Sequence, residues 1–141
     1  LKNVENIIKI NLLGTIYTNQ VFAPLLIRNK LGRIINFSTI AVSIGLKGES
    51  IYAASKAGVE TFTRVFAKEL SSFKITVNCI APGPIRTNLL RGISQKQIDE
   101  ITRHQIINKE MKTFDTYKIV KLLLSQDSEN LTGQVFHVGG V

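Results

Sequence analysis

The 141-residue chain contains a single cysteine, Cys79, and two histidines. One cysteine excludes an internal disulfide, and neither histidine has a partner at metal-ligand spacing, so we predict no metal site. No apolar run approaches the length needed to span a bilayer. There is also no basic-then-apolar leader, and the chain does not begin with Met, so we expect its start to be a cut. These absences predict a cytoplasmic protein that has no membrane partner.

Acidic residues are also scarce, because 10 Asp and Glu face 18 Lys and Arg, which gives a net charge of +8. Such an excess could attract nucleic acid, anionic lipid or phosphorylated ligands. The basic residues are scattered, however, and no window holds a Lys/Arg block interleaved with aromatic residues. The charge therefore indicates a solvated surface, and we expect no nucleic-acid partner.

Apolar periodicity divides the first part of the chain into helices and short strands. Residues 4–29 repeat at helical spacing, with a kink or break expected near Pro24. Residues 33–38 form a β-branched apolar run typical of a buried parallel strand. A loop of small residues follows over 39–50. Residues 51–72 then predict a second helix.

A second strand is predicted over residues 74–81, and it is stopped by a Pro-Gly-Pro sequence. The polar stretch over 85–113 has helical pieces and is typical of a flexible lid over a site. A helix over 115–125 and a last strand over 134–138 complete the alternation. Helices alternating with strands predict an α/β doubly wound domain. No internal repeat, interdomain linker or glycine-rich dinucleotide turn is present.

Tyr52 and Lys56 form a Tyr-x-x-x-Lys pair near the start of the second predicted helix. Their spacing places both side chains on one helical face. A lysine ammonium near a tyrosine favours the phenolate, which makes proton exchange with an alcohol or carbonyl oxygen feasible. The pattern by itself is weak, but the preceding strand ends at Ser38 and Thr39. Parallel sheets place ligand-binding groups at such strand ends, so a hydroxyl there could donate to the substrate oxygen.

Four segments, GRIINFST, YAASKAG, ITVNCIAPGPIRTN and LTGQVFHVGG, resemble successive signatures of the short-chain dehydrogenase/reductase family. Asn11 in KINLLGT resembles a fifth, the helix asparagine of that family. The resemblance covers essentially the whole chain and is greatest to the 3-oxoacyl-acyl carrier protein reductases. It implies that residues 1–141 are the C-terminal half of a Rossmann-like, NAD(P)-binding domain whose N-terminal glycine-rich half is absent.

The resemblance also assigns roles to individual residues. It makes Tyr52 the general acid/base, Lys56 the residue that binds the nicotinamide ribose and lowers the tyrosine pKa, and Asn11 a member of a proton relay. The family serine lies thirteen residues before the tyrosine, where this chain has Thr39, with Ser38 the alternative. Threonine retains a hydroxyl donor. The cofactor-binding set implied is Tyr52, Lys56, Pro82, Gly83, Ile85 and Thr87.

The function implied is NAD(P)-dependent interconversion of a small-molecule carbonyl and a secondary alcohol, with NADP or NAD as cofactor. Residues 89–111 match the family's variable substrate-binding segment, so the substrate is not readable. The helices over 4–29 and 51–72 are the faces expected to build a homo-oligomer, a tetramer or a dimer. The alternative is a non-catalytic fragment or pseudoenzyme that binds partners, and we expect the isolated chain to be inactive.

Overall fold

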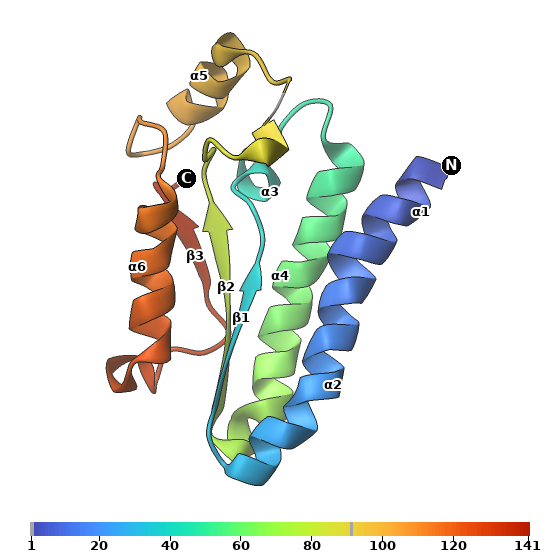
Figure 1. Cartoon of the computed structure of the whole chain (residues 1–141), viewed down its shortest axis with the longest axis vertical. Coiled ribbons are helices and arrows are strands. Elements are labelled where there is room, and N and C mark those ends of the chain that lie inside the picture. Colours follow the sequence, from blue (N-terminus) through green and yellow to red (C-terminus); the bar gives the residue numbers. More distant parts are fainter. Residues whose placement is uncertain (1, 91) are drawn as a thin grey trace.

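A three-stranded parallel sheet forms the centre of the computed structural model, which describes residues 2–90 and 92–141. Its strands are β1 (Gly32–Phe37), β2 (Ile75–Pro82) and β3 (Val135–Val138), in the order β1-β2-β3 (Figure 1). Seven consecutive residues of β2, 75–81, are buried. This unbroken burial, which includes the polar Thr76 and Asn78, is typical of a central parallel strand, because such a strand is covered on both faces.

Helices cover the two faces of the sheet (Figure 1). On one face lie α4 (Ser50–Leu70) and the long N-terminal helix, which comprises α1 (Lys2–Ile8), η1 (Lys9–Leu13) and α2 (Gly14–Asn29). On the other lies α6 (Thr113–Leu124). Each face has its own core, the first built from Ala23, Phe66, Ala67, Leu70, Ile75 and Val77, and the second from Ile80, Met111, Leu123 and Val138. This layered arrangement is the α/β doubly wound architecture that the sequence predicts.

The N-terminal helix departs from the sequence prediction at one point, because it runs through Pro24 without a break. Proline removes the bond to the carbonyl of Gln20, and Gln20 is exposed, so that carbonyl remains accessible to water. The interruption lies instead at the π-helical turn Lys9–Leu13, which contains Asn11. Such π turns inside α-helices are frequent at functional sites.

The same helix corrects the expectation that no segment could span a bilayer. Among the described residues, Asn3–Asn29 is long and apolar enough to do so by length and composition. The sequence search required an uninterrupted apolar run, whereas a helix can meet the criterion with polar residues interspersed. Soluble-protein helices also meet it. Only 11% of its most apolar 18-residue window is buried, and the exposed apolar side chains of the helix include Ile10, Tyr17, Val21, Phe22 and Leu25.

The carboxyl ends of the three strands share one edge of the sheet, and short helices gather above it (Figure 1). These are α3 (Ala41–Ile44), η3 (Asn88–Leu90) and α5 (Gln95–Arg103). The sequence predicts only a loop where α3 lies, since four residues are too few to show periodicity. Two further short helices, η2 (Ser71–Phe73) and η4 (Gln126–Ser128), lead into β2 and away from α6.

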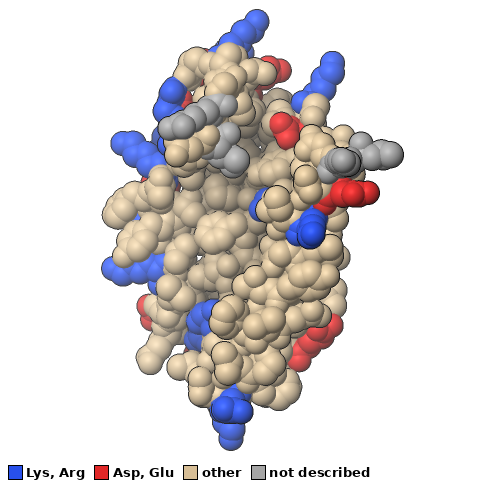
Figure 2. Space-filling view, turned by 45° about the vertical axis from the view of Figure 1, so that its right-hand side comes forward, with Lys and Arg blue, Asp and Glu red and all other residues tan. Residues whose placement is uncertain are grey.

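Basic side chains are spread around the face shown in Figure 2, and much of that face carries no charge. They do not form the single block that a nucleic-acid-binding surface requires. The exposed apolar side chains of α2 therefore lie on a largely uncharged surface.

Candidate active site

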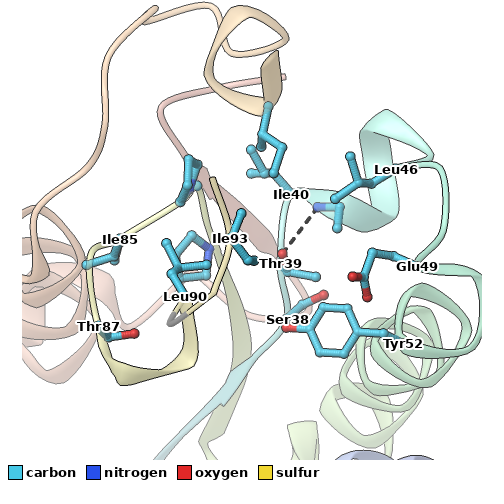
Figure 3. A pocket seen from close by; sticks show the side chains of 15 residues that line it. Ser38, Thr39, Ile40, Leu46, Glu49, Tyr52, Ile85, Thr87, Leu90 and Ile93 are labelled. Carbon is cyan, nitrogen blue, oxygen red and sulfur yellow. Dashed lines mark hydrogen bonds between the residues drawn. The ribbon is translucent and has the colours of Figure 1, made fainter. Parts of the chain in front are cut away.

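A cavity of about 390 Å³ opens at the carboxyl ends of β1 and β2, under the segment that carries η3 and α5 (Figure 3). Its polar lining comes from Ser38, Thr39, Glu49, Tyr52 and Thr87. The rest is largely apolar and includes Ile40, Leu46, Ile85, Leu90, Ile93 and Ile101. An apolar cavity with a few convergent polar groups, at the carboxyl edge of a parallel sheet, is where such folds bind ligands.

Ser38 and Thr39 follow β1 directly, and their hydroxyls have different partners. Ser38 is buried, and its hydroxyl donates to the Glu60 carboxylate at 2.6 Å. The Thr39 hydroxyl accepts from the Ala41 backbone N–H at 3.2 Å and lies near enough to Tyr52 to lower its pKa. Both residues line the cavity, but the Ser38 hydroxyl is engaged by a buried carboxylate and the Thr39 hydroxyl is not.

Tyr52 lies in the first turn of α4, with its ring against the cavity (Figure 3). Burial raises the pKa of Tyr52 above its ordinary value, the Thr39 hydroxyl opposes this rise, and the Glu49 carboxylate adds to it. The Tyr-x-x-x-Lys spacing predicts the opposite direction. The difference arises because desolvation of the phenolate is here the largest influence on the tyrosine.

Lys56 lies one helical turn after Tyr52, and its ammonium donates to the Phe37 carbonyl at 2.9 Å. Burial lowers the pKa of Lys56, and the neighbouring Cys79 opposes that shift. This bond holds the ammonium at the end of β1. It uses one of the three donors that an ammonium has.

Asn11 reaches α4 through a serine that the sequence analysis did not single out. Its amide donates to the Ser55 hydroxyl at 3.1 Å, and Ser55 in turn donates to the Tyr52 carbonyl at 2.7 Å. The Asn11 carbonyl accepts from the Thr15 hydroxyl at 2.8 Å. The π-helical turn and α4 are thereby connected directly behind Tyr52.

The opposite wall is formed by the residues that follow β2. Pro82, Gly83, Ile85 and Thr87 all line the cavity. The Gly83 N–H donates to the Val138 carbonyl at 3.3 Å, which continues the contact between β2 and β3. A Cβ on Gly83 would clash with the amide oxygen of Gln105. The absence of a side chain therefore allows the segment after α5 to pack against the strand end.

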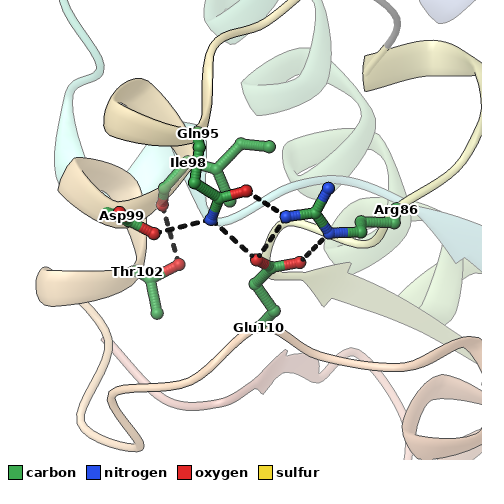
Figure 4. A network of polar contacts seen from close by, with 6 residues as sticks. All are labelled: Arg86, Gln95, Ile98, Asp99, Thr102 and Glu110. Atoms are coloured by element: carbon green, nitrogen blue, oxygen red, sulfur yellow. Dashed lines mark hydrogen bonds and ion pairs between the residues drawn. The ribbon is translucent and has the colours of Figure 1, made fainter.

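Arg86 joins the two ends of the covering segment on the surface (Figure 4). Its guanidinium donates to both carboxylate oxygens of Glu110, at 2.8 and 3.1 Å, and to the side-chain oxygen of Gln95. Gln95, in the first turn of α5, donates to Glu110 at 3.0 Å and to Asp99 at 2.7 Å. We call these four residues the clasp.

Two functional candidates emerge only from the tertiary structure. Glu49 ends the loop before α4 and lines the cavity beside Tyr52, whereas Glu60 lies one turn beyond Lys56 and accepts from Ser38. Glu49 lies three residues before Tyr52 at the start of a helix, and this spacing predicts that the two side chains are near each other. Nothing in the sequence indicates that Glu49 faces a cavity. Cys79 is buried, and burial raises the pKa of its thiol to about 12, which makes it a poor nucleophile.

Comparisons with known proteins agree with this geometry. Residues 1–140 match the family model described as enoyl-(acyl carrier protein) reductase. A 3-oxoacyl-[acyl-carrier-protein] reductase of Buchnera aphidicola is 36% identical over 137 residues, which are 96% of this chain and 56% of that protein. A short-chain type dehydrogenase/reductase of Picea abies is 33% identical, over 96% of this chain and 51% of that protein.

Among solved structures, ElxO with NADP bound superimposes with a TM-score of 0.80 at 27% identity, over 91% of this chain and 53% of that one. The chain spans about half the length of the curated relatives it matches. The family match over nearly every residue, together with the parallel sheet and the cavity at its carboxyl edge, leads to one assignment: the chain belongs to the short-chain dehydrogenase/reductase family, whose Rossmann-like fold its sheet shares.

Proposed function

We propose that the protein carrying this chain is an NAD(P)-dependent oxidoreductase that interconverts a carbonyl and a secondary alcohol. One observation carries the proposal. A cavity-lining tyrosine lies within reach of a hydroxyl on the adjacent strand end and one helical turn from a lysine. That arrangement can move a proton to or from an oxygen atom bound in the cavity.

In the reducing direction, the Tyr52 hydroxyl donates its proton to the carbonyl oxygen of the substrate. Thr39 donates a hydrogen bond to the same oxygen, which fixes its position and stabilises the charge that develops there. Ser38 is the weaker candidate for this role, because its hydroxyl already donates to Glu60. In the oxidising direction, Tyr52 accepts the proton of the alcohol.

The remaining donors of Lys56 suit the hydroxyls of a ribose, since the ammonium is held at the end of β1 by the Phe37 carbonyl. A nicotinamide coenzyme, when bound, supplies or accepts the hydride. Pro82, Gly83, Ile85 and Thr87 form a wall of the cavity that fits the flat face of such a ring. NADP is printed for one structural relative, and we propose NADP or NAD here.

Asn11 is proposed to support a proton relay behind Tyr52. Its contact to Ser55, and that of Ser55 to the Tyr52 carbonyl, place the π-helical turn next to the reacting tyrosine. Residues 1–141 then form part of an NAD(P)-binding domain, with the pyrophosphate held by residues beyond this chain.

The test is the Tyr52→Phe variant of the protein that carries this chain, assayed for ketone reduction with NADPH and NADH. Loss of the general acid predicts a fall in kcat of at least about 100-fold. Tyr17→Phe is the matched control, because Tyr17 is an exposed tyrosine on α2. Retention of wild-type kcat by the Tyr52 variant would exclude the assigned role.

The alternative is a non-catalytic protein that keeps the fold but does not bind a coenzyme. Titration of NADPH and NADH fluorescence separates the two. We expect no binding by the isolated 141-residue chain and binding when it is joined to the N-terminal half of the Buchnera aphidicola relative. If the joined protein and the protein that carries this chain both bind neither coenzyme, the non-catalytic function is the one to retain.

We also propose that the N-terminal helix and α4 build a homo-oligomer. Ile10, Val21 and Phe22 on the first, and Val65 on the second, are exposed by 72, 68, 55 and 49%. Several exposed apolar side chains on neighbouring helices commonly mark a protein contact. Contact with a second copy accounts for the exposed helix without a membrane, and we propose a cytoplasmic location.

A further inference from the structure

Glu49 is the only charged residue among those described as lining the cavity. It comes from the loop between α3 and α4, and Figure 3 shows its carboxylate beside the ring of Tyr52. The neighbouring wall is apolar, with Leu46 on the same loop and Ile93 across the cavity. Among the described lining residues, this carboxylate is therefore the one charge that faces the cavity.

The backbone of Glu49 is held in place while its side chain is left without a partner. Its N–H donates to the Leu46 carbonyl at 3.2 Å, and its carbonyl accepts from the Ala53 N–H at 2.7 Å. Glu49 is the residue before α4, yet its side chain makes no capping bond to that helix. Within residues 2–90 and 92–141 no hydrogen bond or ion pair to the carboxylate is found. The backbone of Glu49 is thus held at the cavity wall, and its carboxylate is available to a ligand.

A half-buried carboxylate beside apolar walls gains most from a positively charged partner. A cation bound there would interact through a medium less polar than bulk water, and an anion in the same place would be repelled. The net charge of +8 acts in the opposite sense. It is spread over the outer surface, however, where salt screens it over about 10 Å.

We propose that Glu49 determines substrate specificity by selecting carbonyl compounds that carry a cationic nitrogen, and by disfavouring a carboxylate or phosphate near the carbonyl. This inference rests on the proposed function, because it names the substrate class of the same cavity. The nitrogen binds at Glu49 while the carbonyl oxygen faces Tyr52 and Thr39.

The test uses two ring ketones that differ in one atom. Dimethylcyclohexanone has a neutral quaternary carbon opposite the carbonyl, and the dimethylpiperidonium ketone has a permanently charged nitrogen there. The measured quantity is the ratio of kcat/KM for the charged ketone to that for the neutral one, in the protein that carries this chain. Both ketones take their proton from Tyr52, so any effect of Glu49 on the tyrosine cancels in the ratio.

We expect the wild-type ratio to exceed one and the Glu49→Gln variant to lower it about tenfold, as for a partly exposed charge pair. Glu69→Gln removes the same charge from the exposed end of α4 and should leave the ratio unchanged. Oxocyclohexanecarboxylate should be the poorest substrate of wild type and should improve in Glu49→Gln. An equal ratio in wild type and Glu49→Gln would overturn the inference.

A binding measurement separates this inference from the proposed function. Ligand-observed NMR follows the dimethylpiperidonium ketone on the wild type and on Glu49→Gln, and it needs no turnover. If neither ketone is reduced but binding weakens in Glu49→Gln, the oxidoreductase assignment fails while Glu49 keeps its cation site. If binding is the same in both, the cation site is wrong whatever the activity.

Discussion

Asn36 lies in β1 with its side chain buried between the strand and two helices. Its amide donates to the Thr63 hydroxyl at 3.0 Å, and its carbonyl oxygen accepts from Asn19 at 2.9 Å. All three side chains are buried. Buried polar groups are costly unless they are paired, so this network ties α2 and α4 to β1 in a specific register. The end of the same strand carries Thr39, whose position depends on that register.

Substitution Asn36→Ala should lower the free energy of unfolding by about 1–3 kcal/mol, because it leaves buried polar atoms of Asn19 and Thr63 without their partner. Urea unfolding of the protein that carries this chain measures the change. Asn130→Ala, at an exposed loop position, is the control and should have little effect. An Asn36→Ala protein as stable as the control would show that the network does not hold the strand.

The titration of Tyr52 provides a second prediction at this scale. Burial raises the pKa of Tyr52, so in the coenzyme-free protein its tyrosinate should form only above the ordinary value of about 10. The folded chain then holds this proton more tightly than the unfolded chain. The linked stabilisation is therefore present below the ordinary pKa and is lost as pH rises through the raised value.

Tyrosinate absorbance is measured against pH for wild type and for Tyr52→Phe, and the difference between the two curves gives the titration of Tyr52 alone. Glu49→Gln should move the midpoint downward, because it removes a negative charge that raises the tyrosine pKa. A Tyr52 midpoint below the ordinary tyrosine value would contradict the burial argument.

At the scale of elements, residues 85–90 and 92–111 belong to a segment that leaves the sheet after β2, covers the cavity and returns to its starting point. Ile85 and Met111 pair as a parallel bridge, and the Met111 N–H donates to the Pro84 carbonyl at 3.2 Å. The clasp of Arg86, Gln95, Asp99 and Glu110 joins the first turn of α5 to the same base. Leu90, Ile93 and Ile101 of this segment line the cavity. We call these three side chains the apolar cover, and we expect the clasp to hold them in place over the cavity.

Loss of the clasp in Arg86→Ala should speed chymotrypsin cleavage within residues 85–111 and raise KM for a ketone more than it lowers kcat. The reason is that the cover is loosened while Tyr52 and Lys56 stay in place. Lys118→Ala removes a different surface pair, Lys118–Asp115 on α6, and should do neither. Cleavage at the wild-type rate would show that the clasp does not restrain the cover.

The clasp also has a defined pH dependence. The Arg86 guanidinium, through its hydrogen bonds, holds the pKa of Glu110 below its usual range. Because the folded-state pKa is depressed, the contact is present above the ordinary glutamate pKa and is lost as pH falls through the lowered value. Chymotrypsin cleavage of the wild type should thus stay slow at neutral pH. At neutral pH, chymotrypsin should cleave Glu110→Gln about as fast as it cleaves Arg86→Ala.

At the scale of the whole molecule, both edges of the sheet, β1 and β3, and one helical face lack a partner among the described residues. β1 pairs only with β2, and Phe37 at its end is 45% exposed. Unpaired strand edges promote association. The isolated 141-residue chain should therefore aggregate in light-scattering measurements, and joining it to the N-terminal half of the Buchnera aphidicola relative should suppress this. Equal solubility of the two proteins would refute the importance of the β1 edge.

The helical face yields a separate prediction. Val21→Glu, in the protein that carries this chain, should shift the mass measured by analytical ultracentrifugation from a dimer or tetramer to a smaller species. A charge in a buried apolar interface costs more than one on an exposed surface. Asn130→Glu makes the same change of charge in an exposed loop and should leave the mass unchanged. An unaltered mass for Val21→Glu would place the interface elsewhere.

The sequence by itself determined the features that depend on local spacing. Alternating helical and strand periods predicted every strand and the three long helices, because apolar residues must recur on one face of whichever element they belong to. The four-residue spacing of Tyr52 and Lys56 placed them one turn apart for the same reason. The short helix α3 was missed because four residues are too few to show periodicity. The helix was not broken at Pro24 because the carbonyl freed at Gln20 remains accessible to water.

Only the tertiary structure decided which groups meet across the chain. The partner of Ser38 is Glu60, 22 residues away, and that of Lys56 is the Phe37 carbonyl, 19 residues away. Such meetings depend on the crossover that lays α4 against the sheet, which no local pattern encodes. The direction of the Tyr52 pKa shift and the place of Glu49 in the cavity followed from burial in the same way. Burial is a property of packed elements, so it appears only once they are assembled.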